Sequence, residues 1–166
     1  MNKITGILAL LFLSVSLHAQ QEDEKEVVTT VLDAWHQAAA DADFEAYFSK
    51  MTEDGVFVGT EAMENWQNAE FKEFSKPYFD KGKAWSFTGL QRNIYFNRTM
   101  DMAWFDELLD TQMKLCRGSG VLKKTEHGWK IAHYVLSIAV PNENVDAVVS
   151  LKKAKDSVIT KQLKLN

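Results

Sequence analysis

The chain has 166 residues with a formal net charge of −4, and 46% of them are hydrophobic, which excludes a disordered chain and is typical of a folded domain with one core. With three arginines (Arg92, Arg98 and Arg117), it lacks the basic surface that binds phosphates, so we expect no nucleic-acid partner. Its single cysteine, Cys116, excludes an internal disulfide, and the histidines show no metal-ligand spacing, so we expect no metal and no cofactor.

Residues 1–19 have the pattern of a secretory signal peptide. Lys3 precedes an apolar run over residues 4–15, and Ala19 is a small residue at a plausible cleavage point. The run is about half as long as a membrane span, which argues against the alternative of an uncleaved anchor. We therefore expect cleavage after Ala19, a periplasmic or secreted location, and no membrane association afterwards. The mature chain has 147 residues and a net charge of −5.

Three helices are predicted in the first half of the mature chain. Apolar residues at intervals of three and four predict a helix over residues 23–40. Asp43 is a candidate N-cap for a short second helix. A brief strand follows over residues 56–58, and a third helix over residues 68–79, where Pro77 is expected to bend or end it.

The second half is predicted to be sheet, with strands over residues 85–96, 102–109, 114–124 and 129–139. Residues 125–128 carry the best hairpin signal, and Asn144 is a candidate cap for a final helix. Helices followed by an antiparallel meander predict an α+β domain with helices on one face of the sheet. We assign residues 20–141 to this domain and residues 142–166 to a C-terminal helical extension.

Several short strings resemble the SnoaL-like members of the nuclear-transport-factor-2-like (NTF2-like) superfamily. Residues 117–122 and 128–137 resemble the last two strands of that fold, residues 103–105 its middle strand, and Gly59-Thr60 with Trp66 and Phe71 its loop into the third helix. The resemblance covers about residues 24–141. It implies a strongly curved sheet wrapped around helices with a pocket at the open end, and dimers through the outer sheet face are common among members. Members include binding domains, associative domains and enzymes, so function stays open.

Hairpin geometry makes His133 a candidate pocket residue. If residues 125–128 form the loop, Gly120 lies opposite His133 and Gly118 opposite Val135, and paired residues point the same way. We therefore expect His133 and Ser137 on the inner face with Ile131. An imidazole there can act as acid, base or donor, or can be a hydrogen-bonded core residue.

Asp106 and Glu107 are the candidate carboxylates. They are adjacent in a predicted strand, so one must face inward, and a register slip of one residue exchanges them. We favour Asp106. An inward carboxylate beside His133 would form an acid–base pair with a pKa raised by burial. The alternatives are pairing with Arg117 or a place at the mouth in solvent.

Two tryptophans, Trp66 and Trp85, are expected near the mouth, where they line an apolar ligand site or pack as core. Glu64 lies close to Trp66. Three functions remain: an exported module that binds a small, partly apolar ligand, a homodimerising association domain, and an isomerase-, dehydratase- or cyclase-type enzyme. The candidate pocket residues are Trp66, Trp85, His133, Asp106 and Ser137, and the candidate catalytic residues are His133 with Asp106 or Glu107.

Overall fold

A computed structural model describes residues 3–165, with side chains described from Gln21 onward. Within that range the chain forms four α-helices, six strands and one short 3-10 helix. In chain order these are α1 (Lys3–Ala40), α2 (Phe44–Ser49), β1 (Met51–Val58), β2 (Asn65–Gln67), α3 (Asn68–Asp80), β3 (Phe87–Phe96), β4 (Met102–Thr111), β5 (Lys114–Thr125), β6 (Gly128–Ile138), the 3-10 helix (Asn142–Asn144) and α4 (Val145–Leu163).

The six strands form one sheet in the order β2-β1-β6-β5-β4-β3. Strands β3 to β6 are an antiparallel meander, as the sequence predicts. Strand β1, however, runs parallel to β6, which makes the sheet mixed. Parallel neighbours cannot be joined by a tight turn. The whole of β2 to β5 therefore lies between β1 and β6 in the sequence.

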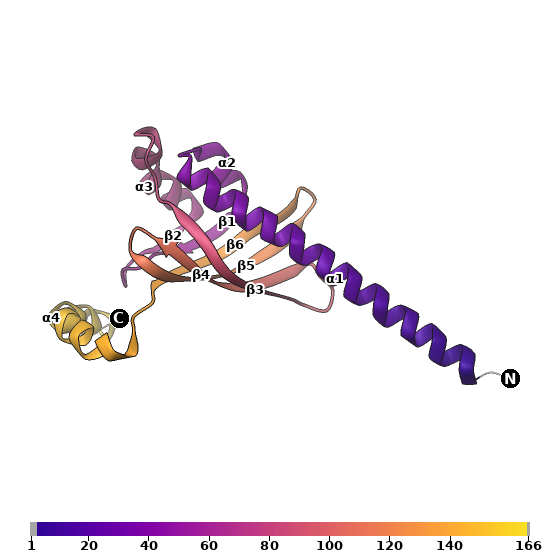
Figure 1. The fold of residues 1–166 in the computed structure, drawn as a ribbon. Coiled ribbons are helices and arrows are strands. Elements are labelled where there is room, and N and C mark those ends of the chain that lie inside the picture. The colour runs from indigo at the N-terminus through magenta and orange to yellow at the C-terminus, as the bar shows by residue number, and fades with distance from the viewer. Residues whose placement is uncertain (1–2, 166) are drawn as a thin grey trace.

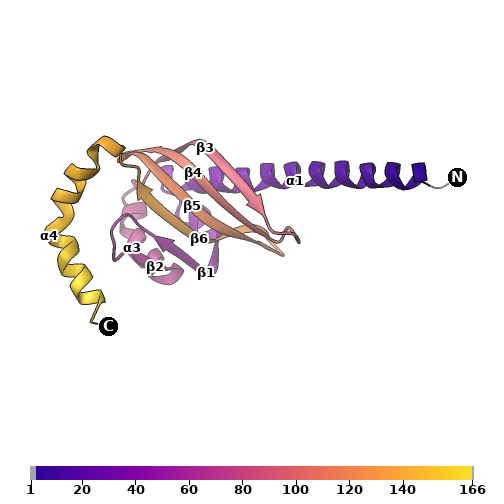
Figure 2. The ribbon, with the colours of Figure 1, turned by 90° about the horizontal axis from the view of Figure 1, so that it is seen from below.

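Helices α1, α2 and α3 lie on one face of the twisted sheet, and α4 lies beyond one end of it (Figure 1, Figure 2). Helix α1 crosses the sheet beside β3, and its N-terminal half extends past the opposite end (Figure 2). Its buried stripe contains Val28, Leu32, Trp35 and Ala39, a spacing of three and four residues. The predicted α+β fold is thus confirmed.

The two short helices begin as their sequences indicate. The Asp43 carboxylate accepts a hydrogen bond from the backbone N–H of Ala46 at 2.9 Å, which confirms Asp43 as the N-cap of α2. Helix α3 is held to β1 by Asn68, whose side-chain N–H donates to the Thr52 carbonyl at 2.7 Å. Pro77 lies inside α3, which continues to Asp80, so of the two effects expected of this proline the ending of the helix does not occur.

An aromatic cluster fills the space between helices and sheet. Trp35 of α1 stacks on Tyr47 of α2 at 4.8 Å between ring centroids and meets the edge of Tyr134 of β6 at the same distance. All three rings are buried. Phe57 of β1 extends the cluster by stacking on Tyr134 at 5.5 Å. The space between α1, α2 and this part of the sheet is therefore filled with buried side chains.

Helix α4 packs only loosely on this body. None of its residues is buried. An ion pair between Lys155 and Glu61 (2.9 Å) joins the helix to the loop after β1. In the described part of the chain, no helix combines the length and apolar character needed to cross a membrane.

Candidate functional site

A cavity of about 200 Å³ opens between the helices and the sheet, at the end of the sheet where β1 and β6 finish. Its walls come from β1, the loop after it, α3, the start of β3, the β4–β5 turn and β6, and we call it the mouth cavity. The lining residues are Phe57, Gly59, Thr60, Glu64, Phe71, Phe74, Trp85, Phe87, Gln112, Met113 and Leu136. Segments far apart in the sequence thus converge on one apolar hollow, as in most small-molecule sites.

Five of the eleven residues that line the mouth cavity are aromatic. Phe57 and Phe71 stack at 4.2 Å with an interplanar angle of 11°. Trp85 stacks on Phe71 at 5.7 Å, and its edge meets Phe79 at 5.4 Å. Because each ring is held by another, this wall is rigid before any ligand arrives.

Glu64 is the one charged side chain among the residues that line the mouth cavity. Its carboxylate accepts a hydrogen bond from the backbone N–H of Glu61 at 3.1 Å, which fixes the loop after β1. The carboxylate lies directly against Gly59, where a Cβ atom would be only 2.1 Å from Glu64 Oε2. Gly59 therefore allows Glu64 to fold inward.

Beneath the mouth cavity lies a buried ionic network centred on Glu107 of β4. Glu107 is 1% exposed. Its Oε1 lies 2.8 Å from Nε2 of His36 and accepts a hydrogen bond from the Tyr134 hydroxyl at 3.2 Å. Its Oε2 accepts from Nε of Arg92 at 2.9 Å, and Nη2 of Arg92 lies 2.7 Å away. Arg92 also donates through Nη1 to Asp33 of α1 at 2.8 Å.

The network keeps Glu107 charged. Burial by itself raises the pKa of the Glu107 carboxyl, but its hydrogen bonds and electrostatic interactions with His36 and Arg92 outweigh it. The pKa of Glu107 therefore lies below its ordinary value of 4.5. Burial and the nearby Glu107 charge raise the pKa of Tyr134 well above its ordinary value. Such a carboxylate is a poor base, because both oxygens are already occupied by donors.

The expectation that His133 faces the interior is wrong. A β-bulge shifts the register of β5 and β6 between Val121 and Leu122: Leu122 pairs with Ile131, whereas Val121 pairs with His133. Ala132 is the extra residue. Beyond the bulge the alternation is reversed, so Tyr134 is buried inside and His133 lies half-buried on the outer face.

The carboxylate preference is also corrected. Glu107 faces inward, whereas Asp106 lies on the outer face, where it accepts a hydrogen bond from Asn93 at 3.0 Å. Asp106 therefore belongs to no inner pocket. Ser137 is exposed and lines a separate hollow beside α4. Of the two mouth tryptophans, Trp85 lines the mouth cavity, whereas Trp66 stacks on Phe74 at 4.8 Å behind it.

Sequence reasoning missed His36, Arg92 and Tyr134 as partners of Glu107. A weak signal existed: Asp33 and His36 are three residues apart on the helix, and His36 lies next to Trp35 on its apolar side. No pattern within β3 distinguishes Arg92 from an ordinary surface arginine. The network therefore becomes visible only when α1, β3, β4 and β6 are brought together.

Comparison with known families gives a match to the SnoaL-like domain over residues 28–141, which is most of the chain. The chain belongs to the SnoaL-like family. The resemblance inferred from the strand motifs is thereby confirmed. No curated protein matches the sequence significantly.

Solved structures similar to this SnoaL-like domain share its fold at low sequence identity. A domain of unknown function with a cystatin-like fold from Nostoc punctiforme PCC 73102 has a TM-score of 0.64 and 14% identity, covering 86% of this chain and 97% of its own. An NTF2-like protein of unknown function from Pseudomonas putida KT2440 has a TM-score of 0.61 and 14% identity, covering 74% and 92%. An NTF2-like protein from Cytophaga hutchinsonii ATCC 33406 has a TM-score of 0.58 and 14% identity, covering 69% and 98%.

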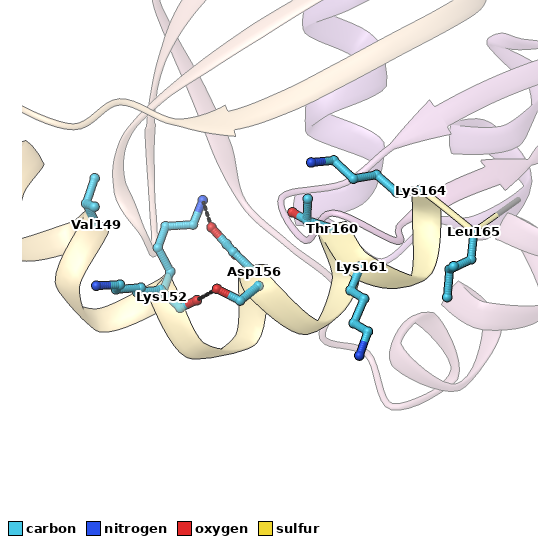
Figure 3. Close-up of a pocket in the computed structure, with 9 residues that line it drawn as sticks. Val149, Lys152, Asp156, Thr160, Lys161, Lys164 and Leu165 are labelled. Atoms are coloured by element: carbon cyan, nitrogen blue, oxygen red, sulfur yellow. Dashed lines mark hydrogen bonds and ion pairs between the residues drawn. The ribbon is translucent and has the colours of Figure 1, made fainter.

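Two other hollows of the SnoaL-like protein involve α4. One, of about 640 Å³, follows the helix itself and is lined mostly by charged and polar side chains, with an ion pair between Lys152 and Asp156 at 3.2 Å (Figure 3). The other, of about 530 Å³, lies between α4 and the ends of β1 and β6. The first is built by a single helix, so no second element encloses a ligand there.

A metal centre finds no support in the described residues. No group of three histidine, cysteine, aspartate or glutamate side chains lies close enough together there to hold a metal ion. Cys116 is a buried free thiol beside Thr111. The mouth cavity is thus the candidate site of this SnoaL-like domain.

Proposed function

We propose that this SnoaL-like protein is exported and binds a small, partly apolar molecule in its mouth cavity. The signal-peptide pattern of residues 1–19 supports export to the periplasm or exterior. The intact mass of the mature protein tests that cleavage. The observation that carries the binding proposal is the aromatic cavity bounded by Phe57, Phe71, Trp85 and Phe87.

The Glu107 network favours binding over acid–base catalysis. Neither His36 nor Tyr134 lines the mouth cavity: the His36 ring packs on Phe87 at 5.8 Å between centroids, and the Tyr134 ring stacks on Phe57 at 5.5 Å. A substrate in the mouth cavity would therefore meet aromatic rings before it met a proton donor or acceptor of the network. The contacts of Glu107 instead hold α1 against the sheet next to the mouth cavity.

Filling the mouth cavity is expected to abolish ligand binding. Met113 lies at the tip of the β4–β5 turn and lines the cavity, so the bulkier ring of Met113→Phe would occupy ligand space. Saturation-transfer NMR with a panel of small soluble alcohols, amines and aromatic compounds measures binding. We expect signals from wild type and at least a roughly tenfold weaker response from the variant, the loss expected when ligand contacts are blocked.

Glu126→Phe is the matched control, because it adds the same ring to an exposed position in the β5–β6 turn, at the other end of the sheet. It should bind like wild type. Equal binding by all three proteins would place the ligand elsewhere and defeat the proposal.

A homodimer is the second proposal, supported by an aromatic row on the outer sheet face. Paired positions across four strands place Tyr95, Trp104, Val121 and His133 side by side. Tyr95 and Trp104 are 46% and 45% exposed, and their rings stack at 6.0 Å. Adjacent exposed aromatic side chains on one face of a sheet favour association. Light scattering should give twice the chain mass for wild type and the single-chain mass for Trp104→Lys; a monomeric wild type would contradict it.

A further inference from the structure

The composition of the mouth cavity specifies a ligand charge. Among the described residues that line it, five carry aromatic side chains, and the one charged group is the carboxylate of Glu64. None of these lining residues is a lysine, arginine or histidine. The polar neutral groups are those of Thr60 and Gln112. We propose, building on the mouth cavity as the binding site, that its ligand is a small organic cation that carries an ammonium group.

Aromatic rings attract cations for a physical reason. The face of each ring carries partial negative charge, so a cation held over several faces is stabilised without a desolvated counter-ion at every contact. The faces of Phe57 and Phe71 pack against other rings, so Trp85, Phe74 and Phe87 are the lining rings left for a cation. Recognition of alkylated ammonium groups by such aromatic cages is the usual functional use of this interaction.

The negative charge of Glu64 adds a preference for a positively charged ligand, which aromatic rings alone do not fix. Its carboxylate folds over Gly59 into the cavity wall and is held there by the Glu61 backbone N–H. A neutral apolar ligand would remove water from this carboxylate without replacing it, which costs free energy. An anion would be repelled. A cation is the one class of ligand that gains from both the rings and the carboxylate.

The surroundings do not neutralise Glu64 in advance. Lys155 of α4 reaches this loop, where it pairs with Glu61 at 2.9 Å. The Glu64 carboxylate accepts the backbone N–H of Glu61 and lies against Gly59, both in its own loop. Glu64 therefore brings its negative charge to the lining of the mouth cavity.

Choline and its uncharged isostere 3,3-dimethylbutan-1-ol test the charge requirement, because they differ only in nitrogen against carbon at the branched centre. Binding is followed by the shift of the Trp85 indole N–H signal in ¹H–¹⁵N NMR spectra. Wild type is expected to bind choline roughly tenfold more tightly than the alcohol, in line with an aromatic cage assisted by a carboxylate.

Glu64→Gln should remove that preference while keeping the fold, because the amide oxygen still accepts the Glu61 N–H. Glu73→Gln, which removes one carboxylate from the exposed face of α3, is the control and should keep the preference. Thermal melting of each variant verifies folding.

The outcomes separate the two proposals. Equal or tighter binding of the alcohol by wild type overturns the ammonium inference and leaves ligand binding at the mouth standing. Choline preference that survives in Glu64→Gln overturns the role of Glu64. If neither compound nor any member of the panel of alcohols, amines and aromatic compounds perturbs the Trp85 signal, binding at the mouth itself is wrong.

Discussion

Replacing Glu107 with alanine is expected to lower the free energy of unfolding by about 3–5 kcal/mol. The reason is the charge left behind. Arg92 is 10% exposed in its side chain and His36 is buried, so both lose a partner in a place that water reaches poorly. Arg92 would keep only Asp33 and the Thr29 carbonyl. Urea unfolding at neutral pH measures the change.

Asp106→Ala is the matched control for this prediction. It removes the same chemical group from the adjacent residue, but on the outer face, where the carboxylate contacts Asn93 in solvent. We expect a loss within about 1 kcal/mol. Similar losses for the two variants would mean that the network around Glu107 contributes little to stability.

The same interaction has a pH signature. Because the pKa of Glu107 in the folded protein lies below its ordinary value, its contribution is complete above that ordinary value and is lost as the pH falls through the folded value. Wild type should therefore lose more stability than Glu107→Gln between pH 7 and pH 3. Glu24 and Asp101 also have lowered pKa values, but they are common to both proteins and cancel in the difference.

Gly120→Ala is expected to cost about 3 kcal/mol, at the upper end for overpacking a core. A Cβ atom at this position would lie 2.3 Å from the His133 carbonyl oxygen and 2.8 Å from a ring carbon of Phe105. The carbonyl is backbone of the neighbouring strand, so it cannot rotate away as a side chain would. Chemical unfolding of the purified variant measures the loss.

Gly89→Ala provides the comparison, since the one close contact of its Cβ atom would be Arg92 Nη2 at 3.4 Å, an ordinary van der Waals distance. It should change stability by less than about 1 kcal/mol. A Gly120 variant as stable as the Gly89 variant would show that the β5–β6 bulge relaxes to admit the methyl group.

The order and type of the elements could be predicted because periodicity and turn residues are local signals. The register could not. Both alternating sets in β4 are apolar, with Ala103 and Phe105 on one side and Met102 and Trp104 on the other, so nothing local decided between Asp106 and Glu107. The hairpin geometry was sound up to Ile131, and the single extra residue Ala132 then turned His133 outward.

The candidate site depended even more on tertiary contacts. Trp85 was expected near the mouth because it begins a strand, and it lines the cavity. The partners of Glu107 come from α1, β3 and β6, and residues that are 71 and 15 positions away meet it. Such pairings are set by how helices cross the sheet, which a single sequence does not encode in any short pattern.

The parallel pairing of β1 with β6 has a kinetic consequence. During synthesis α1, α2 and β1 emerge first, yet the strand that hydrogen-bonds β1 on its inner side is the last of the sheet to appear. The aromatic cluster around Trp35 likewise waits for Tyr134. Contacts so distant along the chain slow folding. The β1–β6 pairing and the complete Trp35 cluster can therefore form only after β6 has been synthesised.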